Sequence, residues 1–256
     1  NVWCAAGKGT FGTQELITRI EASGLTQMIT HRRLIVPQLG AVGIAAHQVK
    51  KLSGFRVLYG PVEARDIIEY LADGLRASGS MRRKTFPVRE RAALIPMELV
   101  PALKYAAMIA VTLALLAGLM GPGSFMSDVL RFGKTAMASL LLAVAAGAVL
   151  VPLLLPWLPG RSFSMKGFWM GLATALAVFL FLFKTTGSVL AIVPWIVLIP
   201  ALSSFLAMNF TGSSTYTSLS GVRREMRIAV PLQAAASVLG VIFWFGTVFA
   251  DRGGVL

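Results

Sequence analysis

Five long runs without a single charged residue dominate the second half of the sequence. They cover residues 105–127, 135–160, 167–183, 185–222 and 228–250. A helix needs about 20 apolar residues to cross the hydrocarbon core of a bilayer, and four of the runs reach that length. The third run is shorter, but Lys166 and Lys184 flank it and can extend their ammonium groups toward the headgroups, so that a short helix still spans. The runs therefore predict a membrane domain.

The fourth run is too long for one span, and its hydroxyl-rich part, residues 211–220, is typical of a loop. We therefore expect an all-α transmembrane domain of five helices over residues 101–256. The predicted spans lie near 102–121, 136–156, 167–184, 188–208 and 229–250. No ionisable residue lies at a predicted span centre, which favours a membrane anchor over an ion transporter.

Composition divides the chain near residue 100. Residues 1–100 carry 14 Lys/Arg and 8 Asp/Glu, whereas residues 101–256 carry 10 and 3. Only 14% of the whole chain is charged, against about 25% in ordinary soluble domains, which excludes a purely soluble protein. A net charge of +13 would indicate nucleic-acid binding in a soluble protein. In a membrane protein it is typical of basic cytoplasmic loops, so we expect no nucleic-acid partner.

The basic residues also predict an orientation. Ten of them fall before the first span or in the second–third and fourth–fifth connections: Arg82, Arg83, Lys84, Arg89, Arg91, Arg161, Lys166, Arg223, Arg224 and Arg227. Four fall on the other side: Arg131, Lys134, Lys184 and Arg252. Because cytoplasmic loops carry the excess of Lys and Arg, we expect residues 1–100 in the cytoplasm, the C-terminus outside, and an inner-membrane location.

Residues 1–100 alternate between helical and extended patterns. Amphipathic helices are predicted at 13–22, 44–52 and 64–75, the last with Ile67, Ile68 and Leu71 on one face. Short strands are predicted at 34–36 and 55–59. Such alternation is typical of an α/β layer with a parallel sheet. The first residue is Asn1 rather than Met, so we expect further strands upstream of the printed sequence.

The lone cysteine lies in the most unusual segment, Asn1-Val2-Trp3-Cys4-Ala5-Ala6-Gly7-Lys8-Gly9. Most free cysteines are small buried hydrophobes. In a helix, however, Lys8 would share a face with Cys4, and a nearby ammonium favours the thiolate that binds metals. No second cysteine or clustered histidine is present for a four-ligand zinc site. A single axial bond to a metal already held by a macrocycle remains possible.

Two phosphate-binding interpretations of the same segment are weak. Gly7, Gly9 and Gly12 fit G-x-G-x-x-G, but no acidic residue ends the next predicted strand. Gly7-Lys8 is followed by Gly9, where a phosphate-binding loop requires Ser or Thr. Ligands of parallel sheets bind at the loops that leave the strand C-termini, here Pro37-Gln38-Leu39-Gly40 and Gly60-Pro61. Both loops also fit ordinary turn chemistry.

The run Asn1–Lys8 resembles the cap-helix motif of the corrinoid proteins of the mercury-methylation pair. Residues 34–41 and 55–61 are similar to the corrinoid-binding domain of the corrinoid iron–sulfur protein of the acetyl-CoA pathway. Asn209-Phe210-Thr211-Gly212 and Ser220-Gly221-Val222 resemble the membrane part of the mercury-methylation protein. The resemblance implies a Rossmann-like corrinoid-binding domain over residues 1–100, followed by the membrane domain.

The resemblance also implies a cofactor and its contacts. Cys4 would be the axial ligand to the cobalt of a cobalamin-type corrinoid and the catalytic residue. The residues expected to bind the cofactor are Asn1, Val2, Trp3, Cys4, Ala5, Ala6, Gly7, Lys8 and Gly9 of the motif and Pro37, Gln38, Leu39, Gly40, Gly60 and Pro61 of the two loops. No iron–sulfur cluster is expected in this chain. The two histidines, His31 and His47, are interpreted as structural or surface residues.

The function implied is a membrane-anchored corrinoid methyltransferase that methylates inorganic Hg(II). Its partners would be a ferredoxin with two [4Fe–4S] clusters as reductant, a folate-type methyl donor and the lipid bilayer. One alternative is a corrinoid methyl carrier with another acceptor, because only the resemblance points to mercury. Another is a non-enzymatic membrane protein with a nucleotide-binding cytoplasmic domain.

Overall fold

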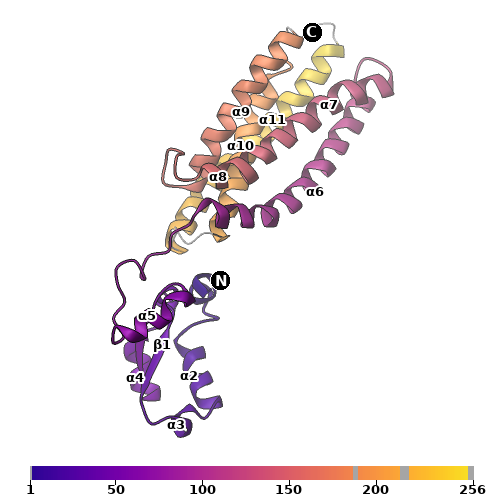
Figure 1. The fold of residues 1–256 in the computed structure, drawn as a ribbon. Coiled ribbons are helices and arrows are strands. Elements are labelled where there is room, and N and C mark those ends of the chain that lie inside the picture. The colour runs from indigo at the N-terminus through magenta and orange to yellow at the C-terminus, as the bar shows by residue number, and fades with distance from the viewer. Residues whose placement is uncertain (1, 187–189, 214–218, 253–256) are drawn as a thin grey trace. The chain divides into compact units, whose positions relative to one another are not determined.

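The chain forms two compact units, residues 1–86 and 87–256. The structure is a computed structural model that describes residues 2–186, 190–213 and 219–252. The first unit contains short helices and two short strands, whereas the second consists of long helices (Figure 1). The first helix of the second unit begins at Val88, so the division between the units precedes residue 100.

The first unit begins with three helices, α1 (Val2–Lys8), α2 (Thr13–Ala22) and α3 (Leu25–Met28). Strand β1 (Arg33–Val36) leads through the 3-10 turn η1 (Gln38–Gly40) and helix α4 (Ala46–Ser53) to strand β2 (Arg56–Tyr59). The two strands are parallel, with Val36 opposite Tyr59. The unit ends with η2 (Ala64–Asp66) and α5 (Ile67–Ala72).

A small hydrophobic core holds the first unit together. Its buried members are Ile20, Val36, Ile44, Val49, Phe55 and Val57. The side chains come from α2, the two strands and α4, together with Ile44 just before α4 and Phe55 just before β2. The Tyr59 hydroxyl donates to the carbonyl oxygen of Ile44 at 2.7 Å and ties the end of β2 to the start of α4.

The expected Rossmann-like corrinoid-binding domain is wrong as a fold. Within the described residues, the chain forms only two short parallel strands and is 74% helical, and no Rossmann-like α/β domain is evident. The local pattern located β1, α4 and β2 within one or two residues, but periodicity describes single elements and does not determine how many strands pair. The number of strands is a non-local property of the sheet.

Helix α5 also differs from its predicted form. It is shorter than the predicted helix at 64–75, and its buried residue is Tyr70, at 1% exposure. Ile67, Ile68 and Leu71 are exposed.

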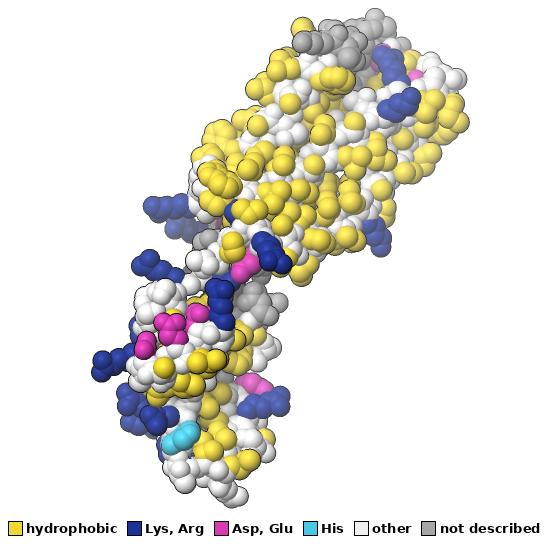
Figure 2. All heavy atoms as spheres, in the orientation of Figure 1, with side chains coloured by type: hydrophobic (Ala, Val, Ile, Leu, Met, Phe, Trp, Pro, Cys, Tyr) yellow, Lys and Arg dark blue, Asp and Glu magenta, His cyan; other side chains and the backbone are white. Residues whose placement is uncertain are grey.

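The second unit is a helical membrane domain. Its helices are α6 (Val88–Met120), α7 (Phe125–Val144), α8 (Val151–Leu154), α9 (Phe163–Thr186), α10 (Val193–Asn209) and α11 (Leu219–Arg252). A π-helical segment, Ala145–Leu150, joins α7 to α8, and a 3-10 turn, Phe210–Ser213, follows α10. The face of this unit seen in Figure 2 is largely apolar, with Lys and Arg side chains near its ends.

Four helices of the described chain are long and apolar enough to cross a membrane: Val88–Met120, Phe125–Leu154, Phe163–Phe183 and Gly221–Asp251. The protein is therefore a membrane protein. The structure corrects the expected count of long spanning helices from five to four, because α10 has only 17 residues. At 1.5 Å per residue α10 is about 25 Å long, at the lower limit for a helix that crosses the hydrocarbon core. It returns the chain from the end of α9 to the start of α11.

Helix α10 forms the centre of the second unit. It packs against α7, α9 and α11, and its buried residues lie on all sides: Pro194, Trp195, Leu198, Ile199, Pro200, Ala201, Ser203, Ser204, Ala207 and Met208. A helix that is apolar all round is buried within a protein rather than partly exposed to water. Part of the predicted loop at 211–220 lies outside the described residues.

Candidate functional site

Most of the unusual N-terminal segment forms a helix. Residues Val2–Lys8 are helical, and the chain leaves the helix at Gly9, whose φ of +83° lies in the left-handed region that favours glycine. The amide of Phe11 donates to the carbonyl oxygen of Ala5 at 3.1 Å, and the Thr10 hydroxyl donates to the same oxygen at 3.2 Å. These bonds close the C-terminal turn of α1.

Not all predicted residues of this segment can be described. Asn1 lies outside the described residues, and so do the side chains of Trp3, Cys4 and Lys8. Val2 is exposed, Ala5 and Gly7 are half-buried, and Ala6 is 4% exposed. The buried side of α1 in the described part is therefore marked by Ala6.

Helix α1 packs against the connection between β1 and α4. A Cβ placed on Gly43 would lie 2.6 Å from the carbonyl oxygen of Ala6 and 2.8 Å from that of Phe11. A Cβ on Gly40 would lie 2.7 Å from the ring of Phe11. Gly43 meets backbone oxygens that cannot rotate away, so glycine is required there, whereas Gly40 makes room for the Phe11 ring. The α1 segment and the loop that follows β1 are therefore in close contact.

Thr13 fastens the start of α2 to the same connection. Its amide donates to the carbonyl oxygen of Gly43 at 3.1 Å, and its hydroxyl accepts from the amide of Ala45 at 2.8 Å. The hydroxyl also lies 3.3 Å from the Gly43 carbonyl oxygen, to which it donates. Both ends of the turn between α1 and α2 are thus attached to the loop after β1.

The two predicted ligand loops lie at one edge of the sheet. Pro37 follows β1 and precedes η1, which contains Gln38, Leu39 and Gly40. Gly60 follows β2, and its amide donates to the carbonyl oxygen of Val36 at 2.8 Å. Gly60 and Pro61 are buried. The strand ends predicted that the two loops share an edge of the sheet, and the structure adds that α1 contacts η1 in the first of them.

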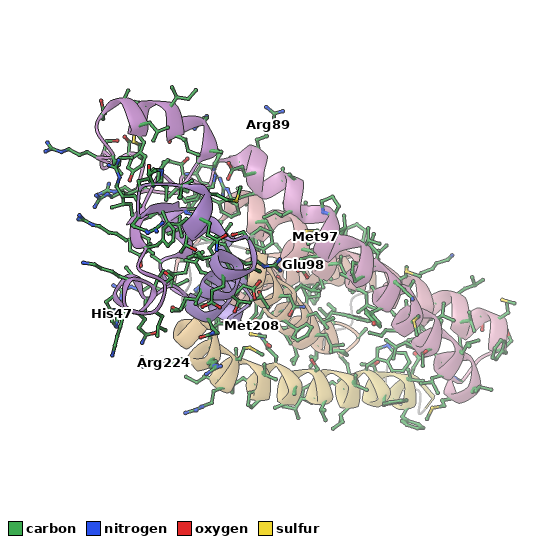
Figure 3. All side chains as sticks on the ribbon, turned by 90° about the horizontal axis from the view of Figure 1, so that it is seen from below. His47, Arg89, Met97, Glu98, Met208 and Arg224 are labelled. Carbon is green, nitrogen blue, oxygen red and sulfur yellow. The ribbon has the colours of Figure 1, made fainter. Side chains whose placement is uncertain are left out.

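No cluster of metal ligands is present within the described residues: nowhere do three His, Cys, Asp or Glu side chains come together. A metal held by protein side chains alone usually needs three or four such ligands. His31 and His47 are both exposed, and Figure 3 labels His47 on the first unit.

A G-x-x-x-G motif in the membrane domain escaped the sequence analysis. Gly167 and Gly171 lie four residues apart on α9. A Cβ on Gly167 would lie 2.5 Å from the Ala207 Cβ, and one on Gly171 would lie 2.6 Å from the Pro200 Cα. Small residues at this spacing let two membrane helices approach closely. The spacing was visible in the sequence, although the partner helix was not.

A polar network joins α9, α10 and α11 beside this motif. The side-chain amide of Gln233 donates to the Ser204 hydroxyl at 2.8 Å, and that hydroxyl donates to the carbonyl oxygen of Ser164 at 2.9 Å. The Ser164 amide donates to the Glu225 carboxylate at 2.6 Å. Ser203 donates to the carbonyl oxygen of Gly167 at 2.9 Å. Gln233 lies within the uncharged run 228–250, so no charge pattern in the sequence indicated it.

Arg91 is a buried cation at the start of α6, with 3% exposure. It donates to the carbonyl oxygens of Pro152 at 3.1 Å and Leu153 at 2.9 Å, and it lies over the Trp157 ring at 5.9 Å. The last carbonyls of a helix lack intrahelical donors and carry partial negative charge. Arg91 thus closes the C-terminal end of α8.

No protein-family model matches the chain, and neither the curated proteins nor the solved structures compared with it contain a match.

Proposed function

We propose that the chain is a membrane-anchored corrinoid methyltransferase that transfers a methyl group to inorganic Hg(II). The observation that carries the proposal is the run Asn1–Lys8, which resembles the cap-helix motif of the mercury-methylation corrinoid proteins. Two structural observations support it: Val2–Lys8 is helical, and α1 lies against the loop that follows β1. The proposal rests on this motif and these contacts, not on a Rossmann-like fold.

The residues present fit a corrinoid by their donor chemistry. A corrinoid carries its cobalt in its own macrocycle, so the protein would need to supply only a single ligand, and a cysteine thiolate is a strong donor. The chain has one cysteine, Cys4, and no cluster of three ligands in its described part. A bound corrinoid would supply the methyl-transfer chemistry, and the protein would supply the axial ligand, orientation and access.

Cys4 and its helix would perform the protein's part of the reaction. In our proposal the Cys4 thiolate would hold the cobalt of the corrinoid, and the bound corrinoid would supply a methyl group suited to an electrophile such as Hg(II). Position 8 lies one helical turn after position 4, and an ammonium there favours the thiolate over the thiol. The contacts of Ala6 with Gly43 and of Thr13 with the same loop hold the helix in place.

The proposed partners and location follow from the same hypothesis. The proposed reductant is a ferredoxin with two [4Fe–4S] clusters, and the proposed methyl donor is a folate-type system. We place the protein in the inner membrane, with the starts of α6, α9 and α11 on the cytoplasmic side. This end carries Arg89, Arg161, Arg223, Arg224 and Arg227; Figure 3 labels Arg89 at the start of α6 and Arg224 at the start of α11. Basic residues are enriched on the cytoplasmic side of membranes.

The decisive experiment is reconstitution of the purified membrane protein with cobalamin. Wild-type protein should bind stoichiometric cobalt, show an absorption spectrum of thiolate-ligated cobalt, and form methylmercury from Hg(II) when supplied with a methyl donor and reductant. Cys4→Ala should lose both the thiolate spectrum and methylmercury formation. Cys4→His separates ligation from catalysis, because an imidazole keeps an axial bond with a different spectrum and weaker electron donation.

A matched control is Met28→Ala, which shortens an exposed apolar residue of the first unit outside the motif and both loops and should leave spectrum and activity unchanged. Full methylmercury formation by Cys4→Ala would contradict the role assigned to Cys4. Bound nucleotide without cobalt would contradict the corrinoid function, and cobalt with methyl transfer to another acceptor would contradict mercury as the substrate. A phosphatase that is active only on the non-cytoplasmic side of the membrane should be active when it is fused to the C-terminus. If instead only a fluorescent protein that folds in the cytoplasm is active there, the proposed orientation is wrong.

A further inference from the structure

A cavity lies in the lipid-facing surface between α6 and α7. Its volume is about 460 Å³, and its lining includes Ala110 and Ala114 of α6 and Gly133, Lys134, Ala138 and Leu141 of α7. The lining is almost entirely apolar, and Lys134 is its one charged residue. The cavity is a groove open at the side of the helix pair, because Val111, Leu130 and Leu141 on its rim are exposed.

The groove exists because small residues draw the two helices together at one level. A Cβ on Gly133 would lie 2.8 Å from the Ala114 Cβ. The short side chains at Ala110 and Ala138 leave the space between the helices unfilled above this contact. Since an open apolar groove on a membrane helix pair faces hydrocarbon chains rather than water, its natural content is an acyl chain.

Lys134 distinguishes this groove from an ordinary lipid-facing crevice. The other charges of this part of α7 are already satisfied: Arg131 pairs with Asp251 at 2.6 Å, and Asp128 accepts from the amide of Gly123 at 2.8 Å. Within the described part of the chain, neither carboxylate pairs with Lys134. A lysine beside hydrocarbon extends its ammonium toward the headgroups, where phosphate is the complementary charge.

We propose that the α6–α7 groove binds one anionic phospholipid, with an acyl chain against the small residues and the phosphate beside Lys134. The lipid belongs to the leaflet on the side of the α6–α7 turn. The site combines an apolar groove for the acyl chain with one cation, Lys134, whose side chain is long enough to extend to the headgroup phosphate. This inference is independent of the corrinoid function.

Native mass spectrometry of the detergent-purified full chain tests the site. Wild-type protein, mixed with equal amounts of phosphatidylglycerol and phosphatidylcholine and then stripped by detergent exchange, should retain one phosphatidylglycerol. Lys134→Gln should reduce that retention about five-fold, the factor that corresponds to about 1 kcal/mol for one lysine beside an anionic lipid. Ala138→Phe should abolish retention of either lipid, because the ring fills the groove from an exposed position.

Lys104→Gln is the matched control, since it removes an exposed lysine of α6 outside the groove and should leave retention unchanged. A thermal-shift assay with inorganic phosphate tells the two sources of phosphate apart, and we expect no stabilisation without an acyl chain. Equal retention of the two lipids by wild-type protein, or unchanged retention by Lys134→Gln, would overturn the proposal. Co-purification of a transmembrane polypeptide that Ala138→Phe releases would overturn it as well.

Discussion

The two units of the molecule use glycine for the same purpose but in different parts of the chain. In the first unit, Gly40 and Gly43 lie in a connection and let α1 and Phe11 contact the loop after β1. In the second, Gly167 and Gly171 lie inside α9 and let a whole helix approach α10. The first unit depends on a few contacts between short elements, and the second on continuous contact along helices. In either place a glycine marks a close approach between two backbone segments. Only in a helix does the spacing of two glycines indicate which face makes the contact.

The largest effect is expected for Gly167→Leu in the membrane domain. A Cβ added at Gly167 would lie 2.6 Å from the Ser203 carbonyl oxygen and 2.5 Å from the Ala207 Cβ. A leucine there must therefore separate α9 from α10. Overpacking of this kind costs about 3 kcal/mol. Unfolding in mixed detergent micelles, followed by circular dichroism, should show this loss. Phe168→Leu, at an exposed neighbour on the same helix, should change stability little.

A smaller effect is expected for Gly43→Ala in the first unit. The new methyl group meets two backbone oxygens, of Ala6 and Phe11, which cannot rotate away. The cost should be about 2 kcal/mol, expressed as detachment of α1 rather than loss of the unit. Hydrogen exchange should then increase at the amides of Phe11 and Thr13, which bond to Ala5 and Gly43. Unchanged exchange at both amides would show that this contact does not hold α1.

The smallest effect is expected for Gln233→Leu. Gln233 is buried, and its amide donates to Ser204, but its side-chain oxygen has no partner within the described part of the chain. The substitution loses one interhelical hydrogen bond, worth about 0.6 kcal/mol in membranes, and removes an unsatisfied acceptor.

The net change for Gln233→Leu should therefore be about 0.5 kcal/mol or less. Ser204→Ala makes the matched comparison, because it leaves the Gln233 amide without its acceptor and should cost about 1–2 kcal/mol. Equal losses for the two variants in the same unfolding assay would contradict this asymmetry.

The sequence predicted the elements better than their ends. Helix α2 matches its predicted bounds, because Ser23-Gly24 stops it locally. Helix α6, however, begins at Val88, well before the predicted span, since Arg89, Glu90 and Arg91 interrupt the apolar run but not the helix. Charged residues indicate where the apolar surface of a helix ends. They do not indicate where the helix itself begins, because its backbone hydrogen bonds continue past that point. Caps act within a few residues, which is why the end of α2 could be predicted.

The candidate site was predictable only as a set of positions. Strand ends at Pro37 and Gly60 follow from the local pattern, and parallel pairing places them at one edge. The contact between Ala6 and Gly43 joins residues far apart in the chain and has no local signal. The number of strands in the sheet was predicted wrongly for the same reason, because it depends on pairing between distant segments rather than on periodicity.

The bond between Arg91 and the end of α8 has a consequence for the order in which the membrane domain is assembled. Its acceptors, the carbonyl oxygens of Pro152 and Leu153, lie 61 and 62 residues further along the chain. During synthesis the first turn of α6 emerges before either acceptor exists. The start of the first membrane helix can therefore reach its final position only after the second has been made, and until then its guanidinium must remain hydrated or bound to headgroups.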